Sequence, residues 1–284
     1  LSRPKDRKHR QPDERHNSHD GEEYHAVVSG LLKRFSPRAA EYTRHRPEYP
    51  PALLDFLEEQ GWIGIGTEVA DVGAGTGIFT EQLIGKGCEV WAVEPNGAML
   101  SMAQNRLQSR SQFHGVPADA EDIRMDDRTV DLVCVAQALH WFDLEAARSE
   151  FERILRKPER VALLWNIRDR EASPFMAGFE DLIAEYGIDY EAVYERFDDY
   201  IGDLDNFFGD SYDHRTFDHP QTVGEQDLIG LVTSYSYMPR PNNENFDEMI
   251  ESLRELFADH ADGGTVDIQY DTELYYGLLS TPVS

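Results

Sequence analysis

Cysteines, basic residues and long apolar runs are all scarce in this sequence. The 284 residues include two cysteines, Cys88 and Cys134, and each lies in an apolar context typical of a buried strand. That number and those contexts exclude a disulfide framework and predict two core residues. No apolar run is long enough to span a membrane, and no signal-peptide pattern is found near the start. We therefore expect a cytoplasmic protein.

Acidic residues outnumber basic residues two to one, with 54 Asp and Glu against 27 Lys and Arg. The net charge of -27 argues against nucleic acid or an anionic membrane as a partner, because both are themselves negatively charged. The length allows one sizeable α/β domain with an accessory cap. No group of side chains has the spacing of a metal site, so we expect no metal.

The first 60 residues divide into a polar tail and a strap. Residues 1–25 mix both charges with several histidines and cannot form a core, which predicts a flexible tail. A basic nucleic-acid arm or a histidine metal cluster is the alternative, but interleaved acids and irregular spacing disfavour it. Residues 26–60 carry Tyr42, Arg46 and Tyr49 on a proline-rich stretch. This pattern indicates either a strap packed on the domain or a lid over a ligand pocket.

A glycine-rich turn organises the central part of the chain. A short apolar run ends at Val72, glycines follow at positions 73, 75 and 77, and apolar residues then recur at helical spacing. The order is therefore strand, turn, helix. Glycines allow a sharp reversal and let a ligand lie against bare backbone, and the amides at the helix start favour a polar or anionic group.

The spacing of the glycines differs from a dinucleotide fingerprint, in which two residues separate the second and third glycines. Here the third glycine comes one residue early, and Ile78 stands at the expected position. Glu94 closes the next strand about 20 residues on, where an acid can bind a ribose diol. The pattern predicts a site for a nucleoside cofactor. A tight turn without a ligand is the alternative.

Strands and helices alternate from the turn to residue 165, which predicts a parallel sheet with right-handed crossovers. Ligands of such sheets bind at the carboxyl ends of the strands. Asp119 is suited to accept a hydrogen bond from an adenine amine, although a turn-forming aspartate is the alternative. The candidate functional residues all follow strands: Gly73 to Gly77, Glu94, Asp119, Gln137 to His140, and Asn166.

The remaining boundaries follow from periodicity and breakers. We expect a cofactor-binding core over residues 61–170 and an acidic helical cap inserted over residues 171–210. Residues 211–284 then supply the last strands and covering helices. A helix is expected to stop at Pro158, and the last strands are expected at Val161 to Trp165, Tyr212 to Phe217 and Thr265 to Tyr275.

From about Phe35 to Leu279 the chain resembles the methyltransferase type 11 group of class I S-adenosylmethionine-dependent methyltransferases. The resemblance implies a Rossmann-like α/β fold, with a seven-stranded, mostly parallel sheet, helices on both faces and a helical cap insertion. The motifs that carry it are Tyr42 with Arg46-Pro47 and Tyr49-Pro50, Asp71-Val-Gly-Ala-Gly-Thr-Gly77, Val93-Glu94-Pro95, Gly115-Val-Pro-Ala-Asp119-Ala-Glu121, Ala136-Gln-Ala-Leu-His-Trp-Phe142 and Trp165-Asn-Ile-Arg-Asp169.

The resemblance implies S-adenosylmethionine as cofactor and S-adenosylhomocysteine as product. Asp71 and the glycine turn would hold the methionine part, and Glu94 the ribose. Asp119 and Ala120 would hold the adenine, although Ala118 stands where the family usually has glycine. The complete set of expected cofactor-binding residues is Tyr42, Arg46, Asp71, Gly73, Ala74, Gly75, Gly77, Glu94, Pro95, Met99, Asp119, Ala120 and Gln137.

The expected reaction is methyl transfer by in-line displacement to an oxygen, nitrogen or carbon of a small-molecule acceptor. His140 is the candidate general base, with a packing histidine that orients Trp141 as the alternative. Arg168 either pairs with an acceptor carboxylate or forms a surface salt bridge. The acceptor pocket is expected to contain Trp141, Phe142, Asn166 and Arg168.

Two other functions remain open at this stage. A regulator could retain the cofactor without transferring its methyl group, and a nicotinamide-dependent oxidoreductase is disfavoured by the early third glycine. Nothing in the sequence decides between a monomer and a homodimer.

Overall fold

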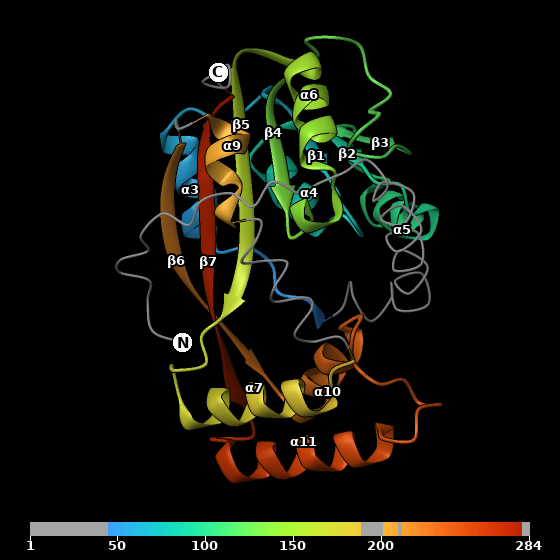
Figure 1. The fold of residues 1–284 in the computed structure, drawn as a ribbon, viewed down its shortest axis with the longest axis vertical. Coiled ribbons are helices and arrows are strands. Elements are labelled where there is room, and N and C mark those ends of the chain that lie inside the picture. The colour runs from blue at the N-terminus through green and yellow to red at the C-terminus, as the bar shows by residue number, and fades with distance from the viewer. Residues whose placement is uncertain (1–44, 189–200, 210–211, 280–284) are drawn as a thin grey trace, which may run out of the picture.

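The computed structural model describes residues 45–188, 201–209 and 212–279 (Figure 1). Tyr42, the expected tail and most of the expected strap segment lie outside the described residues. In the described part, no helix combines the length and apolar character needed to cross a membrane.

One sheet of seven strands forms the centre of the fold, in the order β3-β2-β1-β4-β5-β7-β6. The first five strands in this order are mutually parallel, and β7 runs antiparallel to both of its neighbours. The predicted mostly parallel sheet is confirmed. The strands are β1 (Glu68–Val72), β2 (Glu89–Val93), β3 (Phe113–Val116), β4 (Val130–Ala136), β5 (Leu155–Arg168), β6 (Tyr212–Val223) and β7 (Val266–Leu278).

Helices begin where the sequence supplies caps. Pro51 opens the first described helix, and the side chain of Asn96 accepts hydrogen bonds from the amides of Ala98 and Met99. Asp143 caps the helix after β4 in the same way. The helices are α3 (Pro51–Glu59), α4 (Ile78–Gly85), α5 (Gly97–Leu107), η2 (Leu139–Trp141), α6 (Leu144–Ile154), α7 (Pro174–Tyr186), α9 (Leu204–Phe208), α10 (Glu225–Ser234) and α11 (Phe246–His260).

The sheet has a hydrophobic core on each face. Val69 and Leu132 face the core covered by α3 and α4, whereas their chain neighbours Ala70 and Val133 face the core covered by α6 and α9. Because both faces are buried, these strands read as continuous apolar runs. Cys88 and Cys134 are free and buried, as predicted, and burial raises the pKa of both thiols.

A third core holds a helical cap beyond the carboxyl end of β5, where Figure 1 shows α7, α10 and α11 gathered. The sequence assigned the cap to residues 171–210 and the later helices to the sheet. In the structure α7 joins α10 and α11, while α9 packs on α6, where Arg148 Nε donates to the Phe207 carbonyl at 2.7 Å. An amphipathic helix does not reveal from its sequence alone which apolar surface it will cover.

The strands β5, β6 and β7 are longer than their apolar runs suggested. Both β5 and β6 pair with β7 beyond the parallel part of the sheet, and Val266, Ile268 and Tyr270 enter the core of the cap. The helix expected to stop at Pro158 ends at Ile154 instead. This antiparallel extension brings the cap over the edge of the sheet where the candidate residues lie.

Candidate active site

The glycine turn joins β1 to α4 and is held against β2. The amides of Gly73 and Ala74 donate to the Val93 carbonyl at 2.9 and 3.1 Å. Gly73, Gly75 and Gly77 all have left-handed backbone, with φ of 74°, 57° and 81°. A Cβ at Gly73 would lie 2.4 Å from the Cβ of a packed alanine, whereas a Cβ at Gly75 would meet nothing within 4 Å. Gly75 therefore borders open space where a ligand can approach the backbone.

Glu94 ties this turn to the one that follows β2. Its Oε2 accepts from the Gly75 amide at 2.9 Å, and its Oε1 accepts from the Asn96 amide at 2.8 Å. The side chain is buried, and burial raises the pKa of Glu94 to about 7. The charges of Asp71 and Asp119 raise the pKa further, while the two amide hydrogen bonds oppose the shift.

Asp71 presents a second buried carboxylate to the same space. Its Oδ2 accepts from the Thr80 hydroxyl at 2.5 Å, while Oδ1 is buried with no hydrogen-bond partner among the described residues. Burial raises the pKa of Asp71 to about 6. The hydroxyl of Thr76 is likewise buried without a partner in the described part of the chain. Such polar atoms are costly to bury, so they fit a ligand that brings hydrogen-bond donors.

A cavity that is partly open to solvent connects the glycine turn and Asp71 to the cap. The expected residues Arg46, Gln137, Asn166 and Arg168 do come together in it. The full lining is Arg46, Pro47, Tyr49, Asp71, Gly73, Ala74, Gly75, Thr76, Ile78, Phe79, Ala136, Gln137, Asn166, Arg168, Tyr235 and Tyr270.

Gln137 enters the cavity on an unusual backbone. Its φ is 59°, a left-handed backbone conformation that residues other than glycine rarely adopt. Its amide donates to the Leu164 carbonyl at 2.9 Å, and its Nε2 donates to the Asn166 carbonyl at 3.1 Å. Backbone of this kind at the carboxyl end of a central strand is typical of a functional position.

Two arginines define the end of the cavity next to the cap. The guanidinium carbons of Arg46 and Arg168 lie 4.5 and 5.0 Å from the centre of the Tyr235 ring. Arg168 also forms an ion pair with Glu180 of α7, and the two side chains are 9% and 6% exposed. The salt bridge considered from the sequence therefore exists, but it is buried, and Arg168 still lines the cavity. Burial also raises the pKa of Tyr270 well above its usual value, which keeps that phenol neutral.

Residues 45–50 form a strap across the cavity, held by side-chain amides. Gln82 exchanges two hydrogen bonds with the backbone of Tyr49, at 2.7 and 3.0 Å. Asn166 donates to the Glu48 carbonyl at 3.3 Å and accepts from the Thr272 hydroxyl at 2.7 Å, so its amide already serves the strap. In the described part of this segment, residues 45–50 thus pack on the domain and line the cavity.

The residues expected to act after β4, His140, Trp141 and Phe142, differ in burial, since only Phe142 is fully buried. His140 and Trp141 belong to η2, with ring centres 4.6 Å apart, and neither lines the described cavity. Phe142 is buried beneath the glycine turn, with its Cζ 3.3 Å from where a Cβ of Gly73 would lie. The structure thus does not bring these three side chains together with Arg168.

The residues expected around an adenine lie beyond Glu94. Met99 is buried in α5, Pro95 is exposed, and Asp119 is exposed in a turn whose carbonyl accepts from the Asp122 amide at 3.3 Å. None of these residues lines the described cavity.

Sequence reasoning missed several lining residues, among them Thr76, Tyr235 and Tyr270. Thr76 lies within the glycine turn and was within reach of that argument. The two tyrosines belong to a helix end and to β7, and no local pattern indicates that the cap carries them to this place.

Comparison with known proteins gives consistent matches. The family model for a methyltransferase domain matches residues 70–162. An uncharacterized methyltransferase of Mycobacterium tuberculosis is 33% identical over 226 residues, covering 80% of this chain and 86% of the relative. An uncharacterized methyltransferase of Schizosaccharomyces pombe is 26% identical over 251 residues, covering 85% and 97%.

Solved structures agree at the level of the fold. A protein of Anaeromyxobacter dehalogenans, assigned as a type II methyltransferase, superposes with a TM-score of 0.61 at 20% identity, covering 84% of this chain and 99% of that one. A protein of Anabaena variabilis, assigned as a methyltransferase from an antibiotic biosynthesis pathway, gives 0.53 at 22% identity, with the same coverage.

Alanine substitutions at two positions of the glycine turn should differ in their effects on protein stability and on ligand binding. Gly75→Ala should lower the free energy of unfolding by about 1 kcal/mol, the cost of left-handed backbone for an L-residue, yet weaken ligand binding because its methyl group enters the cavity. Gly73→Ala should cost about 3 kcal/mol or more, because a clash adds to that strain. Urea unfolding and ligand titration of both variants check this, and equal losses of stability would contradict it.

The raised pKa of Glu94 predicts pH-dependent binding of a ligand whose hydroxyls donate to the carboxylate. Because such a ligand binds the ionised form, affinity should be highest above pH 8 and fall as the pH drops through 7, by up to tenfold per unit. Titrations between pH 6.5 and 8.5 measure this. Glu94→Gln should bind weakly and show a flat profile. A wild-type affinity that is constant over this range would contradict the assignment.

Proposed function

The chain belongs to the type 11 family of class I S-adenosylmethionine-dependent methyltransferases, and we propose that it transfers a methyl group to a small-molecule acceptor by in-line displacement. The observation that carries the proposal is one continuous cavity, with the glycine turn and Asp71 at one end and Arg168 at the other. S-adenosylmethionine supplies a methyl group activated as a sulfonium, and S-adenosylhomocysteine is the product.

The cofactor end of the site offers a partner for each polar group of this cofactor. Asp71 Oδ1, buried and without a partner among the described residues, suits the ammonium of the methionine part. The Glu94 carboxylate suits the ribose diol, and the open space at Gly75 admits the cofactor against the backbone. Arg46 suits the methionine carboxylate. The chemistry of these residues therefore suits S-adenosylmethionine.

The acceptor end favours a molecule with an anionic group. Arg46 and Arg168 line the cavity together with a single carboxylate, Asp71, although the whole chain carries a net charge of -27. The cofactor's carboxylate suits Arg46, and Glu180 balances the charge of Arg168 on the side of the cap. Arg168, fixed by Glu180 and stacked near Tyr235, then orients a carboxylate of the acceptor beside the donor.

Such an acceptor needs little proton chemistry from the protein. A carboxylate oxygen is already a nucleophile, so no general base has to remove a proton. Tyr270 stays neutral and can donate a hydrogen bond to the acceptor. General-base catalysis by His140 stays a prediction for acceptors that react through a hydroxyl.

Cofactor binding and turnover test the proposal directly. Calorimetric titration with S-adenosylmethionine should give micromolar affinity that is lost in Glu94→Ala. Incubation with methyl-labelled cofactor and a panel of carboxylates, phenols and amines should transfer label to a carboxylate. Absence of binding by the wild-type protein would overturn the proposal. Binding without transfer to any acceptor would favour the regulatory alternative.

Arg168 should act on the acceptor and not on the cofactor. Removing it alone strands a buried Glu180, which is strongly destabilising, so the test uses the double variant Arg168→Gln/Glu180→Gln. We expect cofactor affinity within about threefold of wild type. We expect kcat/KM for a carboxylate acceptor to fall by about 10- to 100-fold, the loss of one charge-assisted hydrogen bond. An unchanged kcat/KM in the double variant would contradict the role.

A further inference from the structure

The connection between β3 and β4, residues 117–129, has no helix or strand, yet it carries the residues expected at the adenine. Ala118, Ala120 and Ile123 in it are buried. A segment without regular structure lacks the repeated backbone pairing of a helix or strand, so other residues must satisfy much of its backbone where it packs against a core.

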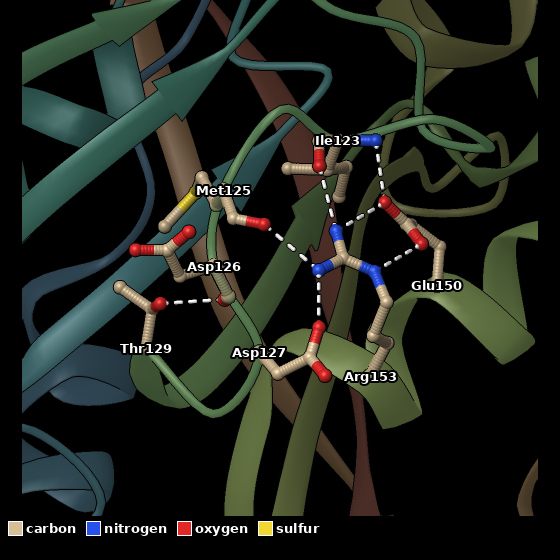
Figure 2. Close-up of polar contacts among 7 residues, drawn as sticks. All are labelled: Ile123, Met125, Asp126, Asp127, Thr129, Glu150 and Arg153. Carbon is tan, nitrogen blue, oxygen red and sulfur yellow. Dashed lines mark hydrogen bonds and ion pairs between the residues drawn. The ribbon is translucent and has the colours of Figure 1, made fainter.

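Arg153 supplies much of this support from the last turn of α6 (Figure 2). Its Nη2 donates to the Ile123 carbonyl at 2.7 Å, and its Nη1 donates to the Met125 carbonyl at 2.8 Å. Nη1 also contacts Asp127 Oδ1 at 2.8 Å. A single planar guanidinium thus binds three successive points of the connection.

Glu150, one turn earlier on α6, pairs with Arg153, and we call these two side chains the clasp. Its two oxygens accept from Arg153 Nη2 and Nε at 2.6 and 2.8 Å, and Oε1 also accepts from the Ile123 amide at 2.7 Å. Figure 2 shows the carboxylate lying between the guanidinium and the backbone of Ile123. The pair therefore binds both the amide and the carbonyl of this residue, which defines the position of the backbone there.

A second tether holds the connection closer to the expected adenine site. Glu121 Oε1 accepts from the amide of Asp143, the residue that caps α6, at 2.8 Å. The connection is thus bound to both ends of one helix. Asp119 lies just before these anchors, and its carboxylate is close enough to Glu94 to raise the pKa of that group.

The contacts of Arg153 differ from those of an ordinary surface ion pair. Exposed ion pairs contribute little to stability, and in such pairs the arginine binds only the carboxylate of another side chain. Here two of the acceptors are backbone carbonyls of an irregular segment, and the rigid fork of arginine matches their spacing. Lysine, with a single compact ammonium, cannot bind the same set.

We propose that Arg153 and Glu150 are positioning residues for the adenine end of the cofactor site, holding residues 117–129 so that Asp119 and Ala120 stay beside Glu94. This inference rests on the proposed function. The two residues lie outside the cavity and do not contact the cofactor, yet their loss lowers both the affinity for the cofactor and the preference for adenine.

The test compares wild type with Arg153→Gln by calorimetry, using S-adenosylhomocysteine and its inosine analogue, which lacks the exocyclic amine. We expect the Kd for S-adenosylhomocysteine to rise about tenfold in the variant and the preference for adenine over hypoxanthine to narrow at least threefold. Arg153→Lys should not restore either quantity. In an Asp119→Ala background, Arg153→Gln should have a smaller effect than alone, because both act through one contact.

Arg148→Gln is the matched control. Arg148 lies on the same helix and likewise forms an ion pair within it, with Glu152. It also donates to a backbone carbonyl, but that carbonyl belongs to α9 and not to the connection after β3. It should leave both quantities within twofold. If Arg153→Gln does not fold, Glu150→Gln is measured instead.

The outcomes separate the two proposals. A wild-type protein that does not bind S-adenosylhomocysteine would overturn the proposed function together with this inference. Wild-type binding with unchanged affinity and unchanged base preference in the clasp variants would overturn this inference alone. A loss of thermal stability equal to that of Arg148→Gln, with no change in base preference, would likewise leave Arg153 a merely structural residue.

Discussion

The burial of one carboxylate constrains the whole site. Glu94 accepts the amides of Gly75 and Asn96, and so joins the turn after β1 to the turn after β2. The two bonds favour the ionised form, but burial opposes it, and the pKa stands near 7. The buried Glu94 carboxylate is costly to ionise, but it places a strong hydrogen-bond acceptor between the turns that lead into α4 and α5. This junction holds the glycine turn against the end of β2.

Around that junction the fold supplies two kinds of support. Side-chain amides of Gln82 and Asn166 hold the strap on one side, and the guanidinium of Arg153 holds the connection after β3 on the other. Both supports bind backbone groups of irregular segments, where no helix or strand pairs those groups regularly. The ligand-facing segments are therefore irregular in conformation but well supplied with partners, as a site that must match a defined cofactor requires.

Local patterns predicted the strand, turn and helix around Gly73 to Gly77. They did so because glycine conformation and helical periodicity each depend on a few neighbouring residues. The composition of the cap was not predictable in this way. The apolar faces of α10 and α11 resemble those of helices that cover a sheet, and only the third core distinguishes them.

The order of residues along the chain was sufficient to predict the parallel sheet and the strand, glycine turn and helix at its carboxyl edge, since these signals act over short distances. The tertiary structure decided the lining of the cavity next to the cap. It brought Tyr235, Tyr270 and Arg168 from three separate elements into one cavity, and it buried the salt bridge between Arg168 and Glu180, which could equally have been exposed. Such contacts depend on where whole elements pack, and packing is a property of the folded chain, not of any stretch within it.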